Sequence, residues 1–176
     1  SRIFMTYNNT IGDVITMAHE AGHAFHSYIL REKRSFASRY PMTLAESAST
    51  FGEMILMEGI MENPEVSDKQ KALTLDMEVG HGAAYLMDIP ARFEFEKAFY
   101  QARQKGELSV SEIKDLMVET QRHIFGDVLE EGSEDPYFWA SKLHFYITGV
   151  TFYNYPYTFG FLLSRGLFAL FQKEGP

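Results

Sequence analysis

The segment VITMAHEAGHAFHSYIL, at residues 14–30, gathers chemically reactive side chains in an otherwise apolar stretch. His19, Glu20, His23 and His26 fall within eight residues, although the whole chain has only six histidines. The apolar residues between them recur at helical spacing and predict a helix that runs to about residue 34. We therefore ask what chemistry such a helix could present on one face.

Two of these histidines are spaced to bind one metal ion. His19 and His23 are four residues apart, so a helix places their imidazoles on the same face, one turn from each other. Their ring nitrogens can converge on one zinc ion at about 2.0–2.1 Å. Glu20 is rotated away and can reach a zinc-bound water, taking its proton as the hydroxide attacks a carbonyl. His-Glu-x-x-His is thus typical of a hydrolytic zinc site; the alternative is a histidine-rich surface helix.

A catalytic zinc site needs a third protein ligand and an open position for water. The pattern MTLAESASTFGEMILMEGIM, at residues 42–61, predicts a second helix that carries Glu46 among small residues. We assign Glu46 as the third ligand and Glu53, two turns later on the same face, as an acceptor that holds a ligand imidazole. Both could instead be solvated helix carboxylates. His26 lies a further turn along, so we expect a pocket or supporting role for it.

The rest of the sequence predicts an all-α protein with one short N-terminal edge strand, in which these two helices are positioned. The strand is expected at residues 2–7, and Asp13 is a candidate N-cap for the first helix. No repeat or clear domain boundary is visible, so residues 1–176 are expected to form a single catalytic domain. The further helical segments are expected at 68–104 with an interruption near Pro90, at 110–124 with Ser109 as N-cap, and after Pro156.

Composition excludes several other classes of protein. The chain has 176 residues, a formal net charge of −8 and no cysteine. The acidic balance argues against a nucleic-acid-binding groove. The lack of cysteine excludes disulfides and thiolate metal sites, and it suits a reducing cytosol, so we expect a cytoplasmic protein. No apolar stretch is long enough for a membrane span, and no signal-peptide pattern opens the chain. The sequence gives no prediction of oligomeric state.

The combined motif resembles the oligoendopeptidase F branch of the thimet oligopeptidase superfamily. The similarity includes HEAGHAFHS, YPMTLAESASTFGE, IPARFEFEKAFY and the aromatic tail, and so covers essentially the whole chain. The resemblance implies one zinc ion bound by His19, His23 and Glu46, with Glu20 as general base. It also implies an endopeptidase that cuts short peptides inside a deep channel. Members of that family are much longer, so the chain is expected to be the catalytic portion of a longer protein.

The resemblance also directs attention to the aromatic tail. In similar peptidases a histidine and then tyrosines in this region face the metal, where neutral donors can stabilise the oxyanion of the tetrahedral intermediate. On that basis we expect His144 and Tyr157 to be the donors, with Tyr153 or Tyr155 as substitutes. The alternative is core packing, which is the commoner role of aromatic residues. His81 and His123 have no companion ligands, so we expect surface or packing roles for them.

Other functions remain open at this stage. The edge strand at residues 2–7 could pair with an extended peptide, or it could be purely structural. A metallocarboxypeptidase would need a basic group for the substrate's terminal carboxylate. Arg39, Arg92 and Arg165 are available, but none lies in a recognisable motif. A zinc-stabilised binding module without catalysis is the third alternative, and Glu20 argues against it.

Overall fold

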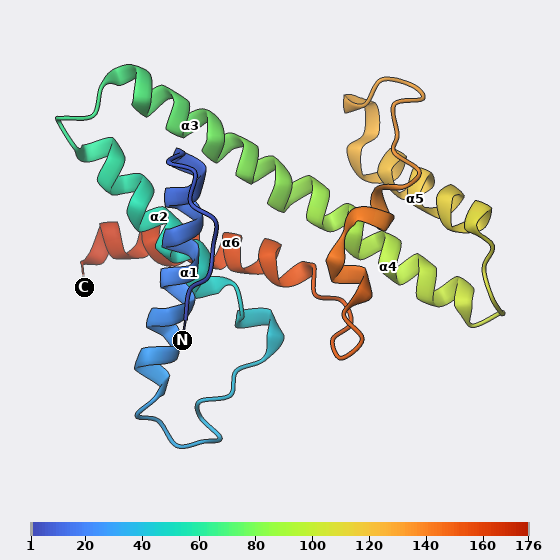
Figure 1. Cartoon of the computed structure of the whole chain (residues 1–176), viewed down its shortest axis with the longest axis horizontal. Helices are drawn as coiled ribbons and strands as arrows, with labels where there is room; N and C mark the ends of the chain where they lie inside the picture. The colour runs from blue at the N-terminus through green and yellow to red at the C-terminus, as the bar shows by residue number, and fades with distance from the viewer. Residues whose placement is uncertain (1, 176) are drawn as a thin grey trace. The chain divides into compact units, whose positions relative to one another are not determined.

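The chain is all-α, as predicted. The computed structural model describes residues 2–175, and no strand occurs in that part of the chain (Figure 1). The short elements are η1 (Met42–Leu44), the π-helical turn η2 (Ala84–Asp88), η3 (Gly126–Val128), η4 (Phe138–Ser141) and η5 (Leu143–Tyr146). The α-helices are α1 (Ile11–Leu30), α2 (Ser47–Glu62), α3 (Asp68–Ala83), α4 (Ile89–Arg103), α5 (Val110–Phe125) and α6 (Tyr155–Glu174).

The predicted edge strand at residues 2–7 is wrong. These residues have no regular secondary structure, and most of them are exposed. A β-strand is stable only when its backbone N–H and C=O groups pair with a neighbouring strand. No such neighbour exists within residues 2–175, so this β-type run has no sheet to join.

The chain divides into two compact units. Unit 1 consists of Ser1–Gly82 with Pro156–Pro176, and unit 2 consists of Ala83–Tyr155. Unit 1 therefore contains α1, α2, nearly all of α3 and nearly all of α6, whereas unit 2 contains α4 and α5. The single catalytic domain expected from the sequence stays a prediction. None of the helices within residues 2–175 is long and apolar enough to cross a membrane.

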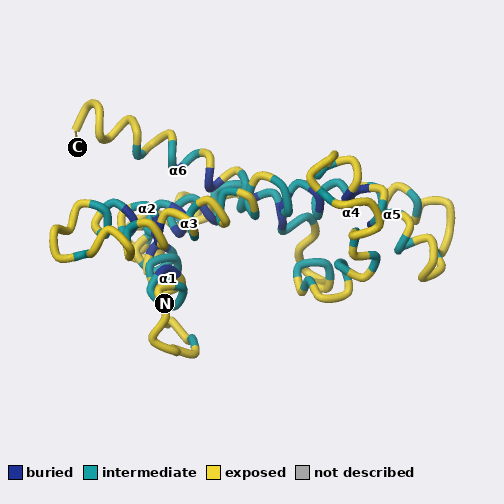
Figure 2. The backbone as a smooth tube through the Cα atoms, turned by 90° about the horizontal axis from the view of Figure 1, so that it is seen from above, coloured by how far each residue is buried: buried dark blue, intermediate teal, exposed yellow. Residues whose placement is uncertain are grey.

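The start of α1 differs by one turn from the expected start. Thr10 is the N-cap, and Asp13, the third residue of the helix, completes a capping box with it. The Asp13 carboxylate accepts from the Thr10 N–H at 2.8 Å, and the Asp13 N–H donates to Thr10 Oγ1 at 3.1 Å. This reciprocal pair satisfies two N–H groups that an uncapped helix leaves free. The helix ends at Leu30, earlier than the expected residue 34, and the following loop is largely exposed (Figure 2).

In unit 1, α1 and α2 pack with their backbones in close contact. A methyl group added at Gly22 of α1 would lie 2.7 Å from the Ser49 Cα, and one added at Gly52 of α2 would lie 2.6 Å from the Ala18 oxygen. Real Cβ atoms do not come so close to backbone, so only glycine fits at these two positions. The contact brings the histidine-bearing helix directly against the first turns of α2.

The second predicted helix begins later than expected. Residues 42–44 form the 3₁₀ turn η1, and α2 starts at Ser47 with Glu46 as its N-cap residue. Glu46 is therefore outside the helix rather than within it, with φ −97° and ψ 0°. The α6 helix passes close to this point, because a methyl group at Gly160 would lie 2.7 Å from the Glu46 carbonyl carbon.

Unit 2 is built around α4 and α5, which pack against each other. Ile89, Phe95 and Met117 are buried there, and burial of one such side chain contributes roughly 1.5–3 kcal/mol. The predicted interruption near Pro90 is confirmed, since the π-helical turn η2 ends directly before α4. Ser109 is the N-cap of α5, as predicted, in a capping box with Glu112.

Candidate metal centre

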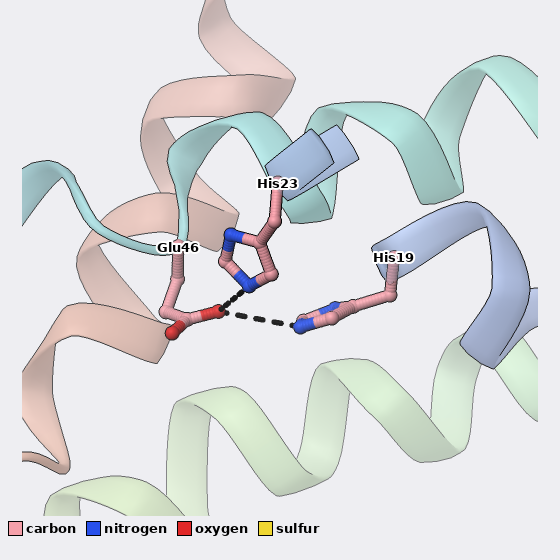
Figure 3. A group of neighbouring side chains, drawn as sticks. All are labelled: His19, His23 and Glu46. Carbon is pink, nitrogen blue, oxygen red and sulfur yellow. Dashed lines mark ion pairs between the residues drawn. The ribbon is translucent and has the colours of Figure 1, made fainter. Parts of the chain in front are cut away.

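Three of the predicted site residues come together in unit 1. The His19 and His23 imidazoles point from α1 toward the Glu46 carboxylate at the start of α2 (Figure 3). Glu46 Oε2 lies 3.3 Å from His19 Nε2 and 3.2 Å from His23 Nε2. The two rings are 4.9 Å apart between centroids and nearly perpendicular. One ligand atom from each residue lies within 4.8 Å of the others, which makes this a group that could hold a metal ion.

The donor set fits a zinc ion in both chemistry and spacing. Zinc takes imidazole nitrogen and carboxylate oxygen at about 2.0–2.2 Å in tetrahedral geometry, which places neighbouring ligand atoms about 3.3 Å apart. The two nitrogen–oxygen distances in this group match that separation. Because two His and one Glu supply three ligands, a fourth position would be left for water or substrate.

Glu53 supports His19 from the opposite side of its ring. Glu53 Oε1 lies 2.5 Å from His19 Nδ1, and the Glu53 side chain is buried. This contact keeps Nε2 directed toward Glu46, as a carboxylate does behind a metal-binding imidazole. Burial alone would lower the pKa of His19, but the hydrogen bonds and charges of Glu46 and Glu53 outweigh it and raise that pKa to about 9. Without a metal, an imidazolium is thus favoured between the two carboxylates.

Glu46 is held in place by short side chains that sequence analysis did not single out. Only 2% of the residue is exposed. Ser49 Oγ donates to Glu46 Oε2 at 3.0 Å, and Thr50 Oγ1 donates to the Glu46 backbone oxygen at 2.7 Å. The signal available in the sequence was the run of small residues after Glu46, but small residues alone do not identify which hydroxyl makes which contact.

The other predicted catalytic residues are less fully placed. Glu20 is half-buried on α1, next to His19. Tyr157 lies in the first turn of α6, three residues before Gly160 and hence on the helix face that contacts Glu46. His144 belongs to η5 in unit 2, where its ring stacks on Tyr153 with 6.4 Å between centroids. The roles of Glu20, His144 and Tyr157 stay predictions.

The remaining histidines lie outside the group. His26 stacks on Tyr40 at 4.5 Å between centroids, and burial and the charge of His23 lower the pKa of His26. His81 is half-buried in α3, and His123 is exposed on α5.

The arginines considered for a carboxypeptidase have other contacts or are exposed. Arg92 pairs with Asp88, Arg165 pairs with Glu78, and Arg39 is exposed in the loop after α1. The two paired guanidinium groups already have a carboxylate each. No observation in the described residues therefore favours the carboxypeptidase alternative.

Comparison with known proteins adds independent evidence. The profile of the family described as Peptidase family M3 matches residues 2–176. The chain is 29% identical over 177 residues to Oligopeptidase PepF of Bacillus subtilis (strain 168), a match that covers 98% of this chain and 26% of the relative. It is 31% identical over 169 residues to an Oligoendopeptidase F homolog of Lactococcus lactis subsp. lactis (strain IL1403), covering 94% of this chain and 27% of the relative.

A third relative gives the same result. Group B oligopeptidase PepB of Streptococcus agalactiae serotype III (strain NEM316) is 30% identical over 168 residues, covering 94% of this chain and 27% of the relative. The chain thus spans about a quarter of the length of these curated relatives. No solved structure matches the chain.

Proposed function

The chain belongs to peptidase family M3, and on that premise we propose that it is the catalytic region of a zinc-dependent endopeptidase that hydrolyses internal bonds of short oligopeptides. The observation that carries the proposal is the convergence of His19, His23 and Glu46. The names of the relatives, oligopeptidase and oligoendopeptidase, support the substrate class. We propose a cytoplasmic location on the sequence argument alone.

In the proposed mechanism His19, His23 and Glu46 hold the zinc ion. Zinc bound there would polarise the scissile carbonyl and lower the pKa of water toward about 7. Glu53 keeps the His19 ring oriented through Nδ1, and Ser49 holds the Glu46 carboxylate through its hydroxyl. Neither residue touches substrate in this mechanism. Both fix the ligand atoms so that the ligands need not reorganise during the reaction.

Glu20 is the proposed general base. Its carboxylate takes a proton from the attacking water and returns it to the nitrogen of the leaving amine, so the peptide C–N bond breaks to give a carboxylate and an amine. General acid–base catalysis of this kind contributes about 10²- to 10⁴-fold to rate. Tyr157 is the proposed donor to the developing oxyanion, on the basis of its position one turn before Gly160.

The test separates zinc binding from catalysis. Glu20→Gln should retain zinc, measured by metal analysis, and should lose at least about 100-fold in cleavage of an internally quenched oligopeptide. Glu32→Gln, an exposed position just after α1, is the matched control and should leave both quantities unchanged. Turnover by Glu20→Gln at the unsubstituted rate would remove the catalytic assignment. Release of only C-terminal residues would favour a carboxypeptidase instead.

A further inference from the structure

Unit 2 contains an aromatic cavity that the proposed hydrolysis does not use. Its volume is about 140 Å³. An engineered cavity of about 150 Å³ holds one benzene molecule, so this one has room for roughly six non-hydrogen atoms. The lining includes Glu96 and six aromatic side chains: Phe95, Phe99, Tyr100, Trp139, Phe145 and Tyr146.

The aromatic rings are fixed by contacts with each other and with the backbone. Phe95 packs edge-on against Phe145 with 5.3 Å between centroids, and it lies 6.2 Å from Phe99. Trp139 Nε1 donates to the Pro136 oxygen at 3.0 Å, which fixes the indole. A ligand would therefore meet preformed π faces with little loss of side-chain entropy.

Glu96 supplies a buried negative charge without a cationic partner. Only 5% of Glu96 is exposed, and its oxygens accept from two neutral donors, the Phe152 N–H at 2.8 Å and the Asn154 Nδ2 at 3.1 Å. Within residues 2–175, Glu96 makes no ion pair, and the buried Asn154 Oδ1 beside it has no hydrogen-bond donor. Neutral donors leave the carboxylate's full charge in place, so the surrounding potential is negative.

Two further observations indicate that this potential reaches the cavity. Burial raises the pKa of Tyr100, a lining residue, and the charge of Glu96 raises it further. Four of the seven Lys and Arg side chains of unit 2 lie over rings outside the cavity: Arg92 and Lys142 over Phe138, Lys97 over Phe93, and Lys114 over Tyr137. In the described part of this unit, the rings that line the cavity make no cation–π contact.

We propose that this aromatic cavity binds an alkylammonium group, the chemical group that a lysine side chain presents. The apolar lining matches the methylene stem, the π faces of Trp139 and its neighbours attract the ammonium, and Glu96 supplies the opposite charge. A neutral ligand of the same shape gains only the first of these contributions. The proposal does not depend on zinc binding or on peptide hydrolysis.

The experiment uses Trp139, the only tryptophan of the chain, as a fluorescent reporter inside the cavity. The whole chain is titrated with butylammonium and with butanol, and in a second pair with Nα-acetyl-lysine amide and the amide of Nα-acetyl-norleucine. We expect a saturable change in emission and at least tenfold tighter binding of the charged member of each pair. If butylammonium binds more tightly than butanol but the lysine derivative binds no more tightly than the norleucine derivative, the site takes free alkylamines. If the lysine derivative is also preferred over the norleucine derivative, the site takes lysine side chains of peptides.

Two substitutions test the source of the preference. Glu96→Gln keeps the shape but removes the charge and should abolish the tenfold preference while butanol still binds. Glu94→Gln is the matched control, because Glu94 lies on the same helix but is paired with Lys97. This variant should keep the tenfold preference for the charged ligand. If Glu96→Gln does not fold, salt dependence in the unsubstituted chain decides, since ammonium binding should weaken with added salt and butanol binding should not. Equal affinity for charged and neutral ligands, or no saturable change in emission, would overturn the proposal.

Discussion

Glu46 in unit 1 and Glu96 in unit 2 are both buried carboxylates, yet their neighbours differ. Glu46 Oε2 lies within 3.3 Å of two imidazole nitrogens, and a second carboxylate, Glu53, stands behind one of these rings. Glu96 accepts hydrogen bonds from one backbone N–H and one amide. The first arrangement gathers groups that could share a metal ion, whereas the second fixes a loop through neutral donors.

The comparison teaches that burial alone does not identify a metal ligand. A buried carboxylate is stabilised either by donors that carry permanent hydrogens or by a cation. Imidazole nitrogens can give up their hydrogens and bind a metal, but backbone and amide N–H groups cannot. The partners of a carboxylate therefore distinguish a candidate metal site from a structural anchor.

The largest expected difference is in zinc affinity, when the charge of Glu46 and that of Glu96 are removed in separate variants. Glu46→Gln removes a charged zinc ligand. Loss of a residue that only supports a ligand typically weakens metal binding 10- to 100-fold, so this substitution should weaken zinc binding by at least about 100-fold. Glu96→Gln should leave zinc affinity unchanged. Competition with a chromophoric chelator measures both, and equal losses in the two variants would contradict the distinction.

The next effect concerns the backbone around Glu46. Gly160→Ala places a methyl group 2.7 Å from the Glu46 carbonyl carbon, so it should lower the free energy of unfolding by about 1–3 kcal/mol and also weaken zinc binding. Gly166→Ala on the same helix meets no atom within 4 Å and should instead stabilise the helix by up to about 1 kcal/mol. Chemical denaturation with and without zinc measures both. A destabilised Gly166→Ala would show that the helix itself, rather than the contact, is sensitive.

At the anchor in unit 2 we expect an effect of similar size on stability, but none on zinc binding. Asn154→Ala removes one hydrogen bond to the Glu96 carboxylate, a loss of roughly 1.5–3 kcal/mol in unfolding free energy for a charged acceptor. Zinc affinity should not change. Urea denaturation followed by Trp139 emission, with metal analysis of the same sample, checks both expectations, and a loss of zinc would contradict the separation of Glu96 from the metal centre.

The smallest expected effect is the pH dependence of stability that the N-terminal caps of α1 and α5 provide, and here the two units should behave alike. The pKa of Asp13 in the α1 cap and that of Glu112 in the α5 cap are both lowered, first by the backbone hydrogen bonds of Thr10 and Ser109. The stability that each cap provides is therefore complete above the ordinary values of 3.8 and 4.5 and is lost as pH falls through the lower folded values. Asp13→Asn and Glu112→Gln should each reduce the loss of unfolding free energy as the pH is lowered, measured by denaturation at several acidic pH values. A larger loss in either variant would contradict the expected direction of the pH dependence.

The parts of the site that depend on local spacing could be predicted from the sequence. The four-residue interval between His19 and His23 fixes a shared helix face whatever surrounds it, and Glu46 with Glu53 stood out as two carboxylates on one face of the next predicted helix. The position of Glu46 before α2, rather than inside it, could not be predicted, because residues 42–46 have ordinary helical composition. What places Glu46 there includes its contact with Gly160, which is 114 residues away in the sequence.

Long-range contacts account for the other differences. The bonds from residues 152 and 154 to Glu96 join segments 56 and 58 residues apart and leave no local pattern. The predicted strand at residues 2–7 has a β-type composition but no partner within the described residues. Local pattern thus predicted the helix that carries the histidines and missed what only tertiary packing decides.

The close contact of Gly160 with Glu46 bears on how the chain takes up its metal. With its backbone enclosed by α6 and its carboxylate tied to Ser49, Glu46 has little freedom to swing away when no ion is present. The entropy of gathering the ligands is then lost when the chain folds rather than when the ion arrives. Removal of the ion with a chelator should accordingly leave a preformed site that binds zinc again without refolding of the chain.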